Sequence, residues 1–164
     1  MLREFQTATL IAATLTTGLS AGLYYGFACA VMPGLARTED RSFIQGMRRI
    51  NTAILNGWFM LLFLGSLLFT IAAAALQLPD AGWGTALPWT VAALVLYVAV
   101  LVVTMSVNVP LNNALEAGDP PDASAELTAL RARFESPWTR WNLIRTVLNA
   151  AAFACLAWAL MRQR

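Results

Sequence analysis

Residues 50–79 read INTAILNGWFMLLFLGSLLFTIAAAALQLP and contain no charged side chain. A helix needs about 20 predominantly apolar residues to cross the hydrocarbon core of a bilayer. The stretch lacks the two-residue alternation of a membrane barrel strand, and lipid offers no partner for the edge of an open sheet. We therefore predict a membrane-spanning helix near 52–77.

Three other segments have the same character. Residues 5–36 and 81–115 are uncharged, and residues 142–161 contain Arg145 as their only charge. They predict further spans near 6–32, 86–108 and 141–161. The expected fold class is all-α: an integral membrane four-helix bundle that forms a single domain over residues 1–164.

The composition agrees with lipid as the solvent. Of the 164 residues, 59% are hydrophobic and only 12% are charged, whereas a soluble domain carries about 25% charged residues. The net charge is +2, and every basic residue is a dispersed arginine. The sequence therefore shows no basic tract for a nucleic acid, and we expect the lipid bilayer and a lipophilic small molecule as partners.

The connections between the predicted spans differ in length. Residues 78–85 contain one proline and two glycines and predict a tight turn. Residues 33–50 form a charged connection. The third connection, 109–140, contains residues 124–134, where apolar and charged side chains recur with helical spacing. We expect a short amphipathic helix there, between the third and fourth spans.

The distribution of arginines predicts the orientation. Four spans place both termini on one side, which carries only Arg3, Arg162 and Arg164, while the other arginines accompany the two long connections. Because cytoplasmic loops are enriched in positive charge, we expect the long connections to be cytoplasmic. The expected location is the inner membrane of a bacterium.

Small residues form a line on the first span. Gly18, Gly22 and Gly26 recur at four-residue spacing. In lipid, such a face lets another helix approach closely. We interpret it as a packing surface, which can include a contact between copies of the chain in a homo-oligomer.

Two segments of the chain echo one another. The first span ends with Val-Met-Pro-Gly-Leu at residues 31–35, and the third ends with Val-Asn-Val-Pro-Leu at residues 107–111. We take a duplicated helical hairpin as a hypothesis.

Polar and aromatic residues gather where the spans meet the long connections, whereas the half of the spans near the termini is mostly Ala, Leu and Val. Arg145 lies seven residues after Trp138, and with Trp141 or Asn142 between them these residues share one helix face. A charge inside a membrane needs acceptors, which asparagine oxygens can supply. The candidate catalytic residues are Arg145, Asn108 and Asn112, and the candidate substrate-binding residues are Tyr25, Asn51, Asn56, Trp138, Trp141 and Asn142.

Other interpretations of this cluster stay open. Trp138 and the arginines near it can be interfacial anchors, and the asparagines can be hydrogen bonds that fix the bundle. The chain has no histidine and no paired cysteines, and no nucleotide fingerprint. We therefore expect no metal site and no bound cofactor.

Several of these motifs together resemble one family of small membrane proteins. They are Tyr25-Gly26-Phe27 and Met32-Pro33-Gly34-Leu35, Met47 with Ile50-Asn51 and Asn56, Asn108-Val109-Pro110-Leu111-Asn112, and Trp138 with Trp141-Asn142 and Arg145. They look like the four-helix family that includes the anthrone oxygenases. Fungal members of that family oxidise anthrones to anthraquinones, so the resemblance implies a four-helix fold and an oxygenase-like activity.

The expected function follows from this resemblance and from the residues. The carbanion of an anthrone can pass an electron to O₂ without a metal or a flavin. We expect a membrane-embedded, cofactor-independent oxygenase-like protein that uses O₂ on a lipophilic aromatic of the anthrone, phenol or quinol type. Arg145 with Asn108 or Asn112 would stabilise the oxyanion, and no general base is evident. The alternatives are a quinone- or lipid-binding accessory subunit and a small transporter component.

Overall fold

The computed structural model describes residues 1–80, 86–117 and 123–163, and this part of the chain contains helices and no strand. The α-helices are α1 (Leu2–Gly26), α2 (Met32–Leu35), α3 (Asp40–Ile54), α4 (Gly57–Gln77), α5 (Leu87–Val103), α6 (Val109–Glu116) and α7 (Ser124–Arg162). Three short elements lie between them: the π-helical turns η1 (Phe27–Val31) and η3 (Thr104–Asn108), and the 3₁₀ turn η2 (Leu78–Asp80).

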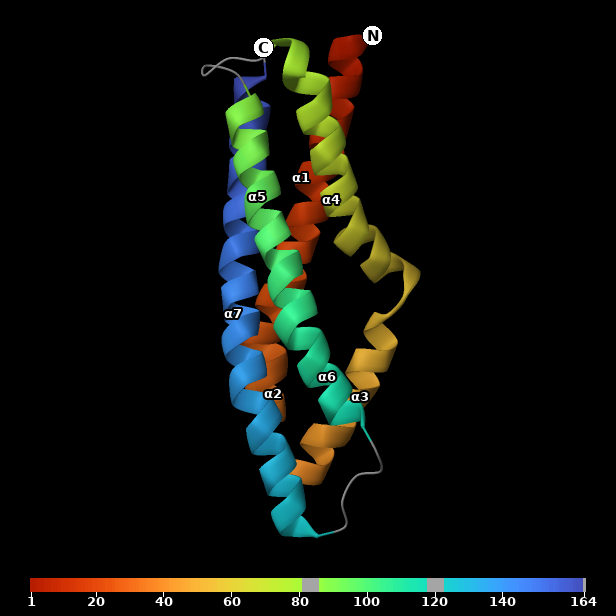
Figure 1. Ribbon diagram of the computed structural model, residues 1–164, viewed down its shortest axis with the longest axis vertical. Helices are drawn as coiled ribbons and strands as arrows, with labels where there is room; N and C mark the ends of the chain where they lie inside the picture. Colours follow the sequence, from red (N-terminus) through yellow and green to blue (C-terminus); the bar gives the residue numbers. More distant parts are fainter. Residues whose placement is uncertain (81–85, 118–122, 164) are drawn as a thin grey trace.

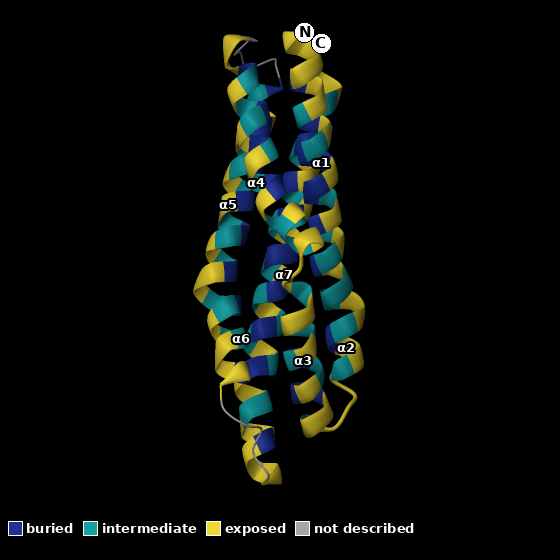
Figure 2. Ribbon diagram, turned by 90° about the vertical axis from the view of Figure 1, so that its right-hand side faces the viewer, coloured by how far each residue is buried: buried dark blue, intermediate teal, exposed yellow. Residues whose placement is uncertain are grey.

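Four helical runs are long and apolar enough to cross a membrane: Leu2–Leu35, Gly57–Gln77, Leu87–Glu116 and Ser124–Arg162. They form an up-and-down bundle in which α1 and α5 each pack against both α4 and α7, and both termini lie at one end (Figure 1). The buried positions turn toward the bundle interior (Figure 2). The predicted all-α, four-span fold class is confirmed, and the spans indicate an integral membrane protein.

The amphipathic segment 124–134 is helical but is not a separate helix. It forms the first part of α7, which continues through Pro137 to Arg162. A proline inside a helix removes one backbone hydrogen bond. Here Phe134 and Trp138, on either side of Pro137, are both buried in one apolar cluster, and this packing holds the helix together across the proline.

The charged connection 33–50 is also mostly helix, which the sequence interpretation missed. Helix α3 is amphipathic, and it buries Phe43, Ile44 and Met47 against Phe134 and the rest of that apolar cluster. It ends at Ile54, short of the predicted second span, which begins at Gly57 instead of residue 52. The predicted turn at 78–85 starts with η2, and residues 81–85 lie outside the described part of the chain.

Arg131 of α7 fastens the connection between α2 and α3. Its guanidinium donates to the carbonyl oxygens of Ala36 and Thr38, both at 2.8 Å, and it pairs with Asp40 at 2.9 Å and Glu135 at 2.6 Å. Charge-assisted hydrogen bonds of this kind are stronger than neutral ones. The contacts tie α3 to α7 at the end of the bundle away from the termini.

This cluster predicts a pH dependence of stability. A hydrogen bond from Thr128, reinforced by Arg131, holds the pKa of the Asp40 carboxyl below its usual value. A lowered native pKa stabilises the fold above the unfolded pKa of about 3.9, and that contribution is lost as the pH falls through the lowered value. Thermal unfolding should therefore show Asp40→Asn below wild type at pH 7, with the gap closing below about pH 4. The exposed Glu39→Gln is the control, and a gap that persists in acid contradicts the prediction.

The half of the bundle near the termini is mostly Ala, Leu and Val, but it also contains buried polar contacts between helices. Gln77 accepts a hydrogen bond from Thr90 at 3.0 Å, and Gln6 donates to the carbonyl oxygen of Leu76 at 2.7 Å. Interhelical hydrogen bonds of this kind join helices in lipid. An apolar layer that includes Leu10, Ala73, Ala93 and Leu156 separates them from the polar residues deeper in the bundle.

The three glycines of the first span, Gly18, Gly22 and Gly26, lie in two different environments. A Cβ at Gly18 would lie 2.9 Å from the Phe153 ring of α7, whereas Cβ atoms at Gly22 and Gly26 would meet nothing within 4 Å. Gly18 therefore serves packing within the chain. A homo-oligomer contact through the remaining two glycines stays a prediction.

Substitutions at these glycines should separate the two environments. Gly18→Leu overpacks the contact with Phe153 and should destabilise the bundle by about 1–3 kcal/mol. Gly22→Leu is the matched control and should be close to neutral. Reversible unfolding in mixed micelles measures both, and equal stabilities of the two variants would refute the assigned contact.

Candidate functional site

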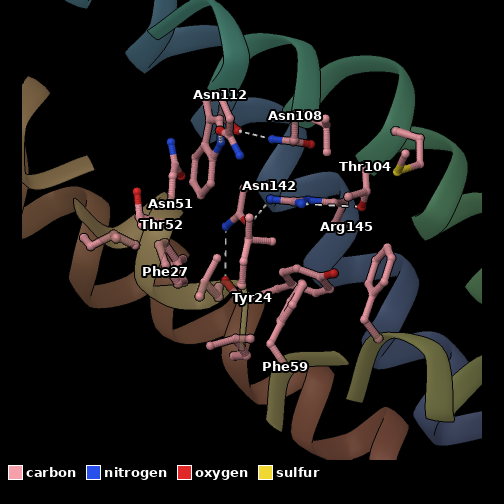
Figure 3. A pocket seen from close by; sticks show the side chains of 18 of the residues that line it. Tyr24, Phe27, Asn51, Thr52, Phe59, Thr104, Asn108, Asn112, Asn142 and Arg145 are labelled. Atoms are coloured by element: carbon pink, nitrogen blue, oxygen red, sulfur yellow. Dashed lines mark hydrogen bonds between the residues drawn. The ribbon is translucent and has the colours of Figure 1, made fainter. Parts of the chain in front are cut away.

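A cavity of about 440 Å³ lies in the half of the bundle that contains α2, α3 and α6. This size is typical of a pocket for a small organic ligand. Its apolar side comes mainly from α1, α3 and α4, and its polar side from η3, α6 and α7 (Figure 3). The aromatic residues in its lining are Tyr24, Phe27, Phe59, Phe63 and Trp138.

The break between α3 and α4, directly before the second span, shapes one side of the cavity. The backbone leaves the helical conformation at Leu55, and Asn56 is extended and caps α4 by accepting a hydrogen bond from the Phe59 amide at 3.1 Å. The chain bends outward at this junction (Figure 1). Leu55, Phe59 and Met60 then line the cavity from the bend.

The polar side of the cavity depends on a π-helical turn. In η3 the amide of Val109 bonds to the carbonyl oxygen of Thr104, five residues earlier, and Pro110 follows directly. The first span repeats this arrangement, because the amide of Met32 bonds to Phe27 and Pro33 follows. Single π turns often mark functional sites, and η3 directs Thr104 and Asn108 into the cavity lining.

Arg145 is the central charge of the site, and its side chain is buried with 5% exposed. It donates to Asn142 Oδ1 at 2.9 Å and weakly to Thr104 Oγ1 at 3.4 Å. Its guanidinium carbon lies 4.6 Å from the Tyr24 ring centre and 5.4 Å from that of Trp138. Nε has no partner in the described part of the chain. No carboxylate of the described residues pairs with Arg145.

Trp138 orients two asparagines of η3 and α6. Its indole N–H donates to Asn112 Oδ1 at 2.8 Å, and its carbonyl oxygen accepts a long bond from Asn108 Nδ2 at 3.4 Å. Asn108 Oδ1 is consequently left without a partner among the described residues. In this orientation the group of Asn108 that lacks a partner is an acceptor, whereas the sequence interpretation expected Asn108 to donate to an oxyanion.

Asn142 links α7 to the first span. Its Nδ2 donates to the Tyr24 carbonyl oxygen at 3.1 Å, and its Oδ1 accepts from Arg145 (Figure 3). Both ends of this buried amide are therefore occupied within the protein. Asn142 thus positions Arg145 against the first span.

The structure gathers six of the nine candidate residues in the cavity lining: Arg145, Asn108, Asn112, Asn51, Trp138 and Asn142. It does not bring Tyr25, Asn56 or Trp141 there. Tyr25 is 61% exposed, Asn56 is an exposed helix cap, and Trp141 is half-buried outside the lining. Helical spacing alone does not separate Trp141 from Asn142, because they lie on either side of the line from Trp138 to Arg145. The packing of α7 buries Asn142 and leaves Trp141 half-buried.

The sequence interpretation missed Tyr24, Thr104 and Glu116 as lining residues. Tyr24 precedes the tyrosine that was chosen, and the burial pattern of α1 selects it. Thr104 and Asn108 are four residues apart in η3, and both line the cavity. Glu116 is the acidic residue that lines the mouth, and it lies at the exposed end of α6.

Comparison with known proteins identifies the family. The family model described as anthrone oxygenase matches residues 58–155, which is more than half of the chain. The chain belongs to the anthrone oxygenase family. The part that matches the anthrone oxygenase family includes Thr104, Asn108, Trp138 and Arg145, while Tyr24 precedes it. Searches of curated proteins and of solved structures gave no match.

Proposed function

We propose that this protein is a membrane-embedded, cofactor-independent oxygenase that acts on a lipophilic aromatic of the anthrone, phenol or quinol type. The observation that carries the proposal is Arg145, a buried cation without a carboxylate partner in the described chain, on the wall of an aromatic-lined cavity. The anthrone oxygenase family match supports the same reaction class.

The chemistry of an anthrone fits this wall. Loss of a proton from the acidic carbon gives a carbanion whose charge is shared with the carbonyl oxygen. One electron passes to O₂, the resulting pair combines to a peroxide, and loss of water leaves a second carbonyl group. The carbon exchanges two hydrogens for one oxygen, and each O₂ yields one water. Arg145 would hold the anionic oxygen, and the mainly apolar lining would limit contact of the intermediate with water.

Glu116 is poorly placed to be the general base for a group held at Arg145. It lies twelve residues beyond Thr104 along the continuous run of η3 and α6, roughly 18 Å at 1.5 Å per residue. Thr104 contacts Arg145 directly. A base must reach within hydrogen-bonding distance of the proton that it removes. We therefore propose that the proton leaves to water.

The test is oxygen consumption by the purified full-length protein in nanodiscs. With anthrone as the probe, we expect O₂ uptake together with an equal amount of anthraquinone, above the rate in empty nanodiscs. Phe59→Ala, which widens the apolar wall, should raise KM more than it lowers kcat, because it removes ring contacts made equally in ground and transition states. Binding of anthrone without turnover would instead favour an accessory subunit. A polar path for transport finds no support across the apolar layer near Leu10.

We further propose that the protein resides in a bacterial inner membrane with the cavity-containing end toward the cytoplasm. The arginines near α2, α3 and the start of α7 support this orientation. A phosphatase reporter fused to the C terminus should be active, since it requires the periplasm. An active cytoplasm-only reporter at that position would reverse the assignment.

A further inference from the structure

We propose that the cavity binds its ligand as an anion in the ground state, before any oxidation. The ligand class is a lipophilic aromatic weak acid, whose conjugate base lies against Arg145 after its proton passes to water. No electron moves in this step. The inference rests on the function proposed above and supplies what that function lacks, a way to ionise the substrate without a general base.

The first argument is the charge of Arg145. Arginine keeps its proton in proteins, and a charge buried in a membrane bundle without a counter-ion costs several kcal/mol. The described structure supplies only neutral partners, Asn142 and Thr104, together with the rings of Tyr24 and Trp138. An anionic ligand provides the counter-charge that these groups do not.

The second argument is where the unused hydrogen-bonding capacity lies. The rings of Tyr24 and Trp138 lie near the guanidinium carbon, and each terminal nitrogen donates one bond, to Asn142 or to Thr104. Nε has no partner among the described residues. Asn108 Oδ1, one turn from Thr104 on η3, is the neighbouring unused acceptor. Two of the five N–H donors of the guanidinium are used by Asn142 and Thr104, so the cation keeps unused donors, that of Nε among them, at a wall of the cavity.

The third argument is the distribution of the other ionisable groups. The described residues that line the cavity include three with ionisable side chains: Arg145 from α7, Tyr24 from α1 and Glu116 from α6. The lining residues from α3, α4 and η3 are uncharged. Glu116 lies roughly 18 Å along the helix from the Thr104 contact, so it does not neutralise the guanidinium. The net field at this end of the cavity is positive.

An opposite charge within about 4–6 Å favours the ionised form of an acid by about one to three pKa units. Arg145 should act on the bound ligand in this way. The proposed consequence is that a ligand which is neutral in the lipid becomes its conjugate base in the cavity. Substrates are then selected by acidity as well as by shape, and a ligand without an ionisable hydrogen gains nothing from Arg145.

The test uses 2-naphthol with the full-length protein in nanodiscs of neutral lipid, under argon so that no oxidation occurs. Absorbance distinguishes naphthol from naphtholate across a pH titration. We expect the midpoint of the bound probe to fall by about one to three pH units relative to empty nanodiscs. Arg145→Gln should abolish the displacement, Arg145→Lys should retain part of it, and Arg140→Gln, an exposed arginine on the same helix, should leave it unchanged. 2-Methoxynaphthalene, which cannot ionise, should bind at least about tenfold more weakly than naphthol at a pH above the midpoint of the free naphthol, where one pKa unit represents a tenfold gain in affinity.

The wild-type titration decides the proposal even if a variant fails to fold. An unchanged or raised midpoint, equal binding of the methyl ether, or no binding of naphthol overturns it. Because the titration is anaerobic, its outcome is independent of turnover. A displaced midpoint without O₂ uptake supports anion binding and refutes the oxygenase, whereas O₂ uptake without displacement supports the oxygenase and refutes ground-state ionisation.

Discussion

Replacing Arg145 by glutamine should lower the rate of anthrone oxidation by at least about 100-fold while leaving the empty bundle as stable as wild type or more stable. The loss of rate follows from removing a preorganised donor to a developing oxyanion, a change that typically costs 10²–10³-fold in kcat. The gain in stability follows because a buried charge without a counter-ion is unfavourable, and an uncharged side chain removes that cost. Glutamine can still donate one hydrogen bond to Asn142.

Opposite signs for activity and stability make this variant informative. kcat and KM with anthrone, and unfolding of the ligand-free protein in mixed micelles, measure the two effects. Arg145→Lys keeps the charge but loses the planar fork, so it should fall between wild type and glutamine in rate. Arg140→Gln is the control for loss of an arginine from α7. If Arg145→Gln unfolds far more easily than wild type, then Arg145 serves the bundle and not the ligand.

The fold was largely predictable from the sequence because one physical requirement, burial of apolar helices in lipid, determines most of it. Uncharged runs long enough to cross lipid specify helices whatever their detailed packing. The prediction failed where charge and helix coincide, in α3. There Phe43, Ile44 and Met47 are buried although Arg41, Arg48 and Arg49 surround them in sequence. A search for long uncharged segments cannot distinguish a charged amphipathic helix from a charged loop.

The sequence allowed us to predict which helix faces line the site, but not each lining residue or the orientation of its side chain. Trp138 and Arg145 follow from helical periodicity, and both line the cavity. The same periodicity left Trp141 and Asn142 as alternatives, of which only Asn142 lines the cavity. To choose Tyr24 instead of Tyr25, one must know how α1 is rotated about its axis, and tertiary packing sets that rotation. The orientation of Asn108 depends on one carbonyl oxygen, that of Trp138, and no pattern in the sequence encodes it. The side-chain orientations of the site residues near the ends of the spans are therefore the hardest feature to predict from the sequence.

Trp138 should be the most costly side chain of the site to remove. Its ring packs against Phe27 with centroids 5.6 Å apart and against Phe134 at 6.0 Å, and it is almost completely buried. Trp138→Ala should destabilise the protein by about 3–5 kcal/mol, as is typical for truncation of a buried tryptophan. The change also removes one face of the Arg145 guanidinium contact and the hydrogen bond that holds Asn112.

Trp138→Phe separates packing from orientation. It retains an aromatic ring beside Arg145 but deletes the indole N–H, so Asn112 loses its donor and is free to turn its amide. We expect a smaller loss of stability, about 1–3 kcal/mol, together with a rise in KM for anthrone. This rise should exceed the change seen for Trp89→Phe, the same substitution at a more exposed tryptophan near the termini and outside the cavity lining. Equal effects at both tryptophans would show that Trp138 acts only as packing. A larger effect at Trp138 would mean that this side chain both stabilises the apolar cluster around Phe134 and Met47 and shapes the ligand cavity.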